Sequence, residues 1–142
     1  MTKTLVIMRG LPGSGKSTKA KAIASEAQAA GKTVTIRSTD DQFMVFGVYR
    51  FDPKRIGAAH HDNHLAVEQD MKDGTEVIIV DNTSIKKWES RGYRDLAQQY
   101  GYKVEECVVG NFSPKDAEVY HARNTHGVPL EVVKRMAAQF EP

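Results

Sequence analysis

Nine residues near the amino terminus have the composition and spacing of a site for a nucleoside triphosphate. They fit the P-loop (Walker A) pattern G-x-x-x-x-G-K-[ST], with the sequence Gly10-Leu11-Pro12-Gly13-Ser14-Gly15-Lys16-Ser17-Thr18. Glycines let backbone N–H groups curl around phosphate oxygens, and a helix amino end adds the positive end of its dipole. The lysine of this pattern contacts the β- and γ-phosphates, and the next hydroxyl holds Mg²⁺. We therefore expect ATP or another NTP here, with Mg²⁺ on Ser17.

Carboxylates follow two further strand-like segments, in Ser38-Thr39-Asp40-Asp41 and in Asp81-Asn82-Thr83. Ligands of open α/β sheets bind at the carboxyl ends of the strands, so both groups are expected near the γ-phosphate. A kinase needs a carboxylate that takes the proton of the acceptor hydroxyl, and Asp40 is interpreted as that base, with Asp81 as a partner of the metal. The alternatives are a helix N-cap, for which Asp41 is the better candidate, and an Asx-turn at Asp81.

A polar pair interrupts an apolar stripe in the segment that follows. At helical spacing Ile56, His60, Asn63, Val67 and Met71 share one face, whereas His61 and His64 lie off its centre. The imidazoles therefore do not converge, and a metal site of histidines is not expected. His60 and Asn63 either hydrogen-bond inside the core or face a cleft and contact a substrate.

Basic residues gather in three places. Lys87, Arg91 and Arg94 are spaced for one helix face, and Arg50 lies beside aromatic residues in a second cluster. Both clusters suit a nucleic acid, and both are equally compatible with a solvated surface. Arg123 precedes a short segment with a glycine, which suggests a lid that supplies charge to the phosphoryl group. The alternative for Arg123 is a residue of the last helical turn that complements the dipole.

The elements that must position these residues alternate along the chain. We expect strands at 4–9, 33–37, 76–80 and 102–109, and helices at 17–30, 53–72, 85–100, 114–124 and from Pro129 onward. Alternating strands and helices imply right-handed crossovers and a mostly parallel sheet covered on both faces. The sequence predicts an α/β fold, a three-layer sandwich with a small parallel sheet.

Length and composition restrict the class of protein further. The chain has 142 residues, 40% of them hydrophobic and 27% charged, with a net charge of +2. This is ordinary globular usage for one domain over 1–142, without an apolar run of the roughly 20 residues that span a bilayer. The lone Cys107 makes no internal disulfide. We expect a single cytoplasmic domain with no membrane partner.

In these residues the chain resembles the P-loop kinase domain of bacteriophage 5′-hydroxyl polynucleotide kinases and their bacterial and animal relatives. The resemblance covers nearly the whole chain. It rests on the P-loop, Ser38-Thr39-Asp40-Asp41, Ala59-His60-x-x-Asn63, Asp81-Asn82-Thr83, Tyr100-Gly101-Tyr102-Lys103-Val104-Glu105, Arg123-Asn124, Val128-Pro129-Leu130 and Arg135-Met136. It implies a P-loop NTPase fold, Asp40 as the general base, Lys16 and Ser17 as the phosphate and metal residues, Asp81 as a second active-site aspartate, and Arg123 as a lid arginine.

The implied activity is ATP-dependent transfer to the 5′-hydroxyl of a DNA or RNA end, a reaction of nucleic-acid repair. Two positions depart from the phage pattern: Phe43 stands where those enzymes carry an arginine for the acceptor phosphate, and His126 stands in a shorter lid with one arginine fewer. The length leaves no room for the phosphatase domain of the phage enzymes. Two alternatives remain, a kinase of small metabolites or nucleosides and an ATP-binding module without catalysis.

Overall fold

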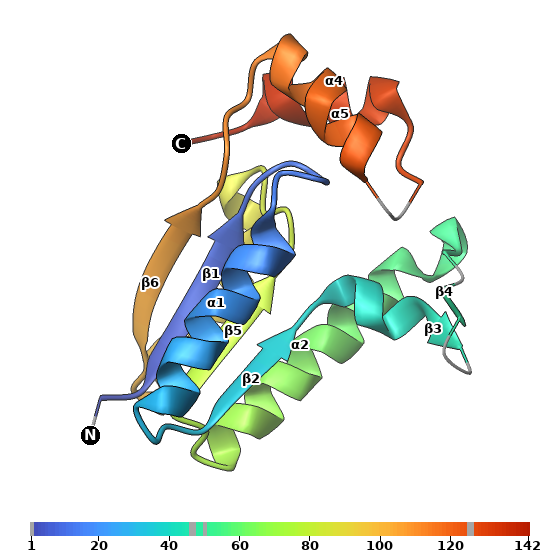
Figure 1. The fold of residues 1–142 in the computed structure, drawn as a ribbon. Helices are drawn as coiled ribbons and strands as arrows, with labels where there is room; N and C mark the ends of the chain where they lie inside the picture. Colours follow the sequence, from blue (N-terminus) through green and yellow to red (C-terminus); the bar gives the residue numbers. More distant parts are fainter. Residues whose placement is uncertain (1, 46–47, 50, 125–126) are drawn as a thin grey trace.

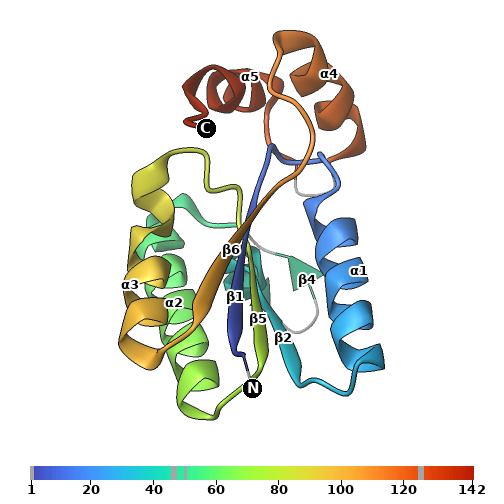
Figure 2. The same ribbon diagram turned by 90° about the vertical axis from the view of Figure 1, so that its left-hand side faces the viewer.

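The structure, a computed structural model, describes residues 2–45, 48–49, 51–124 and 127–142. Four parallel strands form the central sheet in the order β2 (Val34–Arg37), β5 (Val77–Asp81), β1 (Thr4–Arg9) and β6 (Lys103–Val108). The first helix, α1 (Lys16–Ala29), covers one face, and α2 (Ile56–Lys72) with α3 (Arg91–Tyr100) covers the other (Figure 2). The three-layer α/β fold expected from the sequence is confirmed.

Apolar strand residues explain why both faces must be covered. β1 and β5 are buried along almost their whole length, and their side chains alternate between the two faces. Leu5 and Ile7 pack toward α2 and α3, whereas Val6 and Met8 pack toward α1. Each face thus has its own hydrophobic core, and the sheet places the carboxyl ends of β1, β2 and β5 at one edge.

Two further helices lie beyond that edge, above the strand ends (Figure 1). Ser113 caps α4 (Pro114–Arg123), where proline takes the first helical position, and α5 (Leu130–Gln139) follows, close to the predicted ranges. Leu11 of the P-loop and Ile85 pack with these helices in a third hydrophobic cluster. The pair therefore forms a cover that touches the P-loop directly.

The predicted helix at 85–100 begins later than expected. Residues 82–86 are a loop, a single 3₁₀ turn η3 (Lys87–Ser90) follows, and only then does α3 begin. The reason is Arg9, whose buried guanidinium donates to the carbonyl oxygens of Ser84 and Ile85. Those carbonyls are engaged by a side chain from β1 instead of by a helical turn.

Four short elements connect β2 to α2. They are η1 (Thr39–Phe43), a two-stranded hairpin of β3 (Met44–Val45) and β4 (Val48–Tyr49), and η2 (Pro53–Arg55), which leads into α2. The sequence had no signal for a hairpin of two-residue strands. Arg50 and His126 lie outside the described residues, so the predictions made for them stay predictions.

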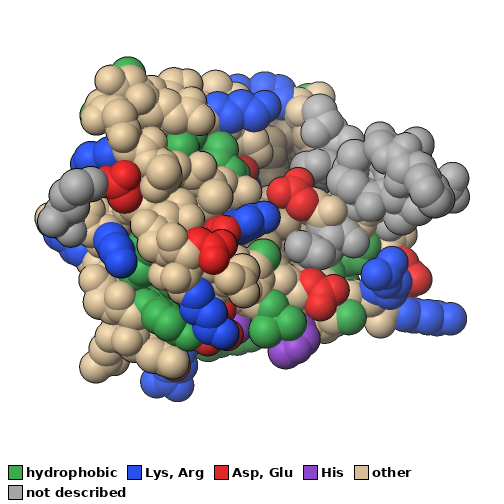
Figure 3. Space-filling view, turned by 90° about the horizontal axis from the view of Figure 1, so that it is seen from below, with side chains coloured by type: hydrophobic (Ala, Val, Ile, Leu, Met, Phe, Trp, Pro, Cys, Tyr) green, Lys and Arg blue, Asp and Glu red, His purple; other side chains and the backbone are tan. Residues whose placement is uncertain are grey.

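The opposite end of the molecule, where the strands begin, has mixed charge. Seen from below, basic and acidic side chains are interspersed over this face (Figure 3). Within the described residues, none of the helices combines the length and apolar character needed to cross a bilayer.

Candidate active site

The P-loop forms the tight turn that its glycines predicted. Gly13 and Gly15 have φ of +79° and +102°, a region that residues with a Cβ rarely adopt. A Cβ at Gly13 would also lie 2.1 Å from the carbonyl oxygen of Tyr120 in α4. The loop is tied to the end of β5, because Gly10 N donates to Thr83 O at 2.9 Å. Backbone conformation and the cover helix thus both require glycine here.

Polar groups of the loop are arranged to receive an anion. Ser14 Oγ is buried and has no hydrogen-bond partner among the described residues. Such an atom is costly to leave unpaired, so an incoming phosphate oxygen would satisfy it. Pro12 and Ser14 are half-buried, whereas Gly15, Ser17 and Thr18 are exposed at the start of α1. The residues present therefore fit a nucleotide phosphate.

Lys16 folds back over the loop, with Nζ donating to Leu11 O at 3.1 Å. Its pKa is lowered from 10.5, because burial disfavours the charged ammonium more than Asp81 and then Asp40 stabilise it. The charges of Asp81 and Asp40 thus both act on the ammonium of the P-loop lysine.

Ser17 and Asp81 meet as a pair. The hydroxyl of Ser17 donates to Asp81 Oδ2 at 2.8 Å, which joins the start of α1 to the end of β5. Asp81 is buried, and hydroxyl and carboxylate oxygens are the hard ligands that Mg²⁺ prefers. The pair fits a Mg²⁺ ion, as the pattern of the P-loop predicted for Ser17.

Asp40 is positioned by hydrogen bonds to the residues beside it. Ser38 caps η1, since its hydroxyl accepts from Asp40 N at 3.2 Å. Thr39 is held twice: its N–H donates to Asn82 Oδ1 at 2.8 Å, and its hydroxyl lies 3.1 Å from His60 Nδ1. Thr39 thus joins the ends of β2 and β5 to α2, a role that sequence reasoning missed because threonine carries no distinctive signal.

The prediction that Asp41 is the N-cap is wrong. Ser38 takes that place, and Asp41 lies inside η1, which begins at Thr39. Asp41 sits three residues after the cap, where its carboxylate accepts from the backbone of Ser38. The N–H of Asp41 in turn donates to the backbone carbonyl oxygen of Ser38 at 3.0 Å. Burial is the main cause that raises the pKa of Asp41, and the charges of Asp40 and Asp81 add to it.

The two polar residues of α2 have separate places. Asn63 has no exposed surface, and its Nδ2 donates to the hydroxyl of Tyr93 in α3 at 2.8 Å. His60 is exposed and reaches the active-site edge through Thr39. The structure therefore brings His60, Asn82 and Asp81 together at the strand ends and leaves Asn63 in the core between α2 and α3, where a substrate has no access to it.

Arg123 ends α4, the helix that touches the P-loop. Its guanidinium lies 5.1 Å from the ring centre of Tyr120, and its side chain is exposed. The carbonyl of Tyr120 is the group nearest Gly13, so the carboxyl end of α4 lies directly against the phosphate loop. Arg123 also sits in the last helical turn, as its alternative interpretation expected. Phe43, at the position of the missing arginine, is buried with its ring 5.2 Å from that of Phe51.

Sheet order, P-loop and flanking helices together define an α/β P-loop NTPase fold. Residues 5–142 match the model of the AAA domain family. The chain belongs to that family.

Curated proteins that are similar in sequence include one of Homo sapiens and one of Pongo abelii. NEDD4-binding protein 2 of Homo sapiens is 37% identical over 140 residues, which is 96% of this chain and 8% of that protein. The 2',3'-cyclic-nucleotide 3'-phosphodiesterase of Pongo abelii is 31% identical over 102 residues, 72% of this chain and 23% of that protein. The chain thus spans less than a quarter of the length of either relative.

Solved structures share the fold. The Pnkp1/Rnl/Hen1 complex matches with a TM-score of 0.64 and 23% identity, covering 86% of this chain and 39% of that chain. A gluconokinase from Sinorhizobium meliloti 1021 matches with a TM-score of 0.59 and 20% identity, covering 99% and 75%. At these identities the likeness concerns the fold, and the substrate has to be argued from the site.

Proposed function

We propose that residues 1–142 form a single domain that transfers the γ-phosphate of ATP to the 5′-hydroxyl of a polynucleotide. One observation carries this proposal: Ser17 of the P-loop bonds to Asp81, and Thr39 bonds to Asn82, so that Asp81 and Asp40 come together at the ends of two strands, where both charges act on Lys16. Asp81 accepts a hydrogen bond from Ser17, and these two side chains together would hold a metal ion. Asp40 is the second carboxylate at the phosphate end, as an acceptor hydroxyl requires.

In this reaction the acceptor oxygen forms a bond to the γ-phosphorus while the bond to the β,γ-bridging oxygen breaks and ADP leaves. Asp40 takes the proton of the hydroxyl. Lys16, the backbone N–H groups of the P-loop and Arg123 stabilise negative charge on the moving phosphoryl group. Mg²⁺, held through Ser17 and Asp81, would add positive charge between the phosphates.

The polynucleotide acceptor is supported by the ordered set of motifs shared with phage 5′-hydroxyl kinases. Phe43 is buried against Phe51 and offers no charge to an acceptor phosphate, so that contact has to come from elsewhere in this chain. The alternative acceptor is a small metabolite, for which the gluconokinase is an example on the same fold. A nucleotide-binding module without transfer is the second alternative.

The test offers γ-labelled ATP with a 5′-OH DNA oligonucleotide, a 5′-OH RNA oligonucleotide and a panel of nucleosides and sugars in parallel. We expect label on oligonucleotide 5′ ends. Label on a small metabolite alone would show a small-metabolite kinase, the first alternative. No transfer to any acceptor would show a nucleotide-binding module without catalysis, the second alternative.

Asp40→Asn is expected to lower kcat by roughly 10²- to 10⁴-fold, because it removes the base and keeps the shape of the side chain. Binding of ATP, measured by calorimetry, should stay unchanged. Asp41→Asn is the matched control, since it makes the same change one residue away at a carboxylate bonded to Ser38, and its kcat should remain close to the parent value. Equal activity of the Asp40→Asn variant and the parent protein would remove Asp40 from the mechanism.

A further inference from the structure

Trp88 is the only tryptophan of the chain and is 70% exposed. Tryptophan is strongly buried on average, so an indole left in water is informative. It lies on η3, the single turn that follows the active-site loop 82–86. The active site described above makes no use of it.

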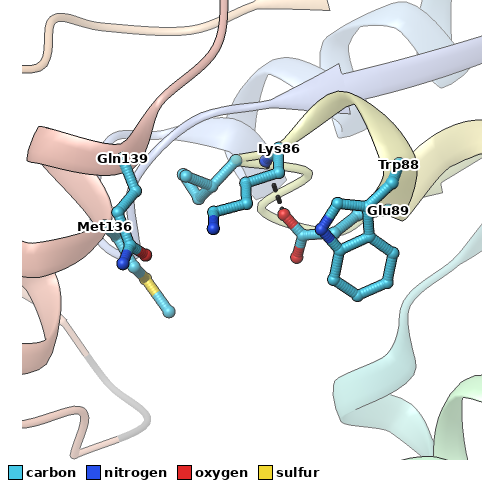
Figure 4. Close-up of a pocket in the computed structure, with 6 residues that line it drawn as sticks. Lys86, Trp88, Glu89, Met136 and Gln139 are labelled. Carbon is cyan, nitrogen blue, oxygen red and sulfur yellow. Dashed lines mark hydrogen bonds between the residues drawn. The ribbon is translucent and has the colours of Figure 1, made fainter.

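The indole borders a pocket of about 240 Å³ between η3 and α5. Trp88 and Glu89 form one side, Met136 and Gln139 the other, and Lys86 extends between them (Figure 4). The Lys86 N–H donates to the Glu89 carboxylate at 2.6 Å, which fixes the turn that displays Trp88. One positive and one negative charge line this pocket, so it suits an uncharged, flat group.

This pocket lies next to the P-loop. Ile85, which lines it, packs in the same cluster as Leu11 of the P-loop. Thr83, two residues earlier, accepts from Gly10 N. The pocket and the P-loop are therefore joined through the loop 82–86 and one hydrophobic cluster.

The other side of η3 is positively charged. A second cavity, of about 470 Å³, is bordered by Lys87, Arg91 and Arg94 together with Arg9, Asp95 and Glu106. Glu106 is already paired with Arg9 at 2.6 Å and lies 3.5 Å from Arg94. Within the described parts of the chain, the side chains of Lys86, Lys87 and Arg91 enter no ion pair. Lys87 and Arg91 are therefore available to an external anion.

We propose that η3 is a binding subsite for a single-stranded nucleic acid acceptor, with a base stacked on Trp88 and the adjoining backbone phosphates bound by Lys87 and Arg91. This inference rests on the proposed function and adds the group that holds the acceptor. An aromatic ring beside basic residues is the combination that binds single strands, because bases stack on the ring while cations neutralise phosphates. It also supplies the phosphate contact that Phe43 cannot make.

Fluorescence of the sole tryptophan gives a readout that does not depend on transfer. Titration of the parent protein with a 5′-OH oligodeoxynucleotide of eight residues should quench Trp88 in a saturable manner. A nucleoside, which has no neighbouring phosphates, should quench weakly. Oligonucleotide binding by calorimetry without any change in the fluorescence would overturn the proposal.

Variants at Trp88 separate stacking from apolar packing. Trp88→Leu keeps an apolar side chain at the pocket and loses the aromatic face, and the KM for the oligonucleotide should rise about fivefold to a hundredfold. Trp88→Phe, which retains a ring, should recover most of that loss. Both variants should keep the parent KM for ATP. Equal KM values for the oligonucleotide in the parent and in Trp88→Leu would refute stacking.

Salt dependence tests the binding of backbone phosphates. The double variant Lys87→Ala/Arg91→Ala should lower the slope of log Kd against log salt by about 0.7 for each phosphate that the protein no longer neutralises. Lys21→Ala is the matched control, because Lys21 is an exposed basic residue of α1 on the opposite face of the sheet, and its slope should equal that of the parent. An unchanged slope in the double variant would remove Lys87 and Arg91 from the proposal.

The two proposals fail in different ways. If the parent protein phosphorylates oligonucleotides while Trp88→Leu has the same KM and no quenching occurs, the function stands and the subsite is wrong. If the parent protein transfers phosphate only to a small metabolite and no oligonucleotide quenches Trp88, both are wrong.

Discussion

Gly13 is a residue of the phosphate loop that lies directly against the cover helix α4. Replacing it with alanine combines a left-handed φ of +79° with a Cβ 2.1 Å from Tyr120 O. Gly31 has nearly the same φ, +78°, and no atom within 4 Å of its virtual Cβ. We expect Gly31→Ala to cost about 1–2 kcal/mol of unfolding free energy. Gly13→Ala should cost about 1–3 kcal/mol more, because α4 must also move.

Urea denaturation of the two alanine variants and the parent protein provides the comparison. Since the backbone cost is common to both variants, the difference between them measures the contact with α4. Equal losses of unfolding free energy would mean that α4 can move away from residue 13 without an energetic cost. The contact of Tyr120 with Gly13 would then not fix the position of Arg123.

At the same scale, the sequence predicted the candidate site residues more readily than their structural partners. The P-loop pattern, Asp40 and Asp81 were predicted from spacing, because backbone geometry requires glycine and the proposed chemistry requires carboxylates. Thr39 and Tyr120 were missed, because each acts through a contact with a residue distant in sequence. The sequence around Thr39 and around Tyr120 contains no pattern that would predict these contacts.

At the scale of the element, α2 and α3 are joined by a buried hydrogen bond and by a second, half-buried one from the Tyr100 hydroxyl to Glu68 Oε2 at 3.0 Å. Asn63 donates to the hydroxyl of Tyr93, and Asn63 Oδ1 has no partner among the described residues. Tyr93→Phe removes the acceptor and leaves both polar atoms of the amide unpaired. We expect a loss of about 1–3 kcal/mol in unfolding free energy, measured by urea denaturation.

Asn63→Leu provides the contrast for that experiment. It removes the buried amide altogether and keeps a side chain of similar volume, so it should cost less than Tyr93→Phe, although Tyr93 then lacks a partner. Oligonucleotide kinase activity should survive both changes, since Asn63 is closed to a substrate. A selective rise in the acceptor KM of Asn63→Leu, with stability unchanged, would return Asn63 to the binding site.

Prediction of the elements succeeded where one stretch of sequence determines the structure. The strands at 4–9 and 103–108 and the capped helix from Pro114 follow from apolar runs and from Ser113-Pro114. The amino end of α3 was misplaced, because the carbonyls of Ser84 and Ile85 are taken by Arg9, some 75 residues away in sequence. Helical periodicity in 85–100 contains no information about that competitor.

At the scale of the whole molecule, Arg9 connects the sheet to the cover. It is 2% exposed and donates to the loop after β5, to Glu106 in β6 and to the carbonyl of Glu141 near the carboxyl terminus. Its guanidinium also lies 4.6 Å from the ring centre of Phe140, which stacks on Phe112. A buried cation needs such partners. Because Glu106 is the titratable group that pairs with Arg9, this connection between the sheet and the cover depends on pH.

Glu106 gives this dependence a definite sign. The hydrogen bond from Arg9 is the main cause that lowers the pKa of Glu106 below its ordinary 4.5. The unfolded chain therefore binds a proton first as the pH falls, so the contribution of Glu106 is complete above pH 4.5 and is lost as the pH drops through the folded pKa. Glu106→Gln keeps the shape and removes the charge. Its unfolding free energy should lie below that of the parent protein at neutral pH and approach the parent value in acid.

Glu105→Gln is the matched control, since Glu105 is the neighbour in β6 and its exposed carboxylate lies 3.9 Å from exposed Lys103. Exposed pairs contribute little, so the control should follow the parent protein at every pH. Chemical denaturation of the three proteins at a series of pH values from neutral to acid gives the curves. A Glu106→Gln curve parallel to that of the parent would mean that Arg9 is held by carbonyl oxygens alone, and the connection between sheet and cover would then be independent of charge.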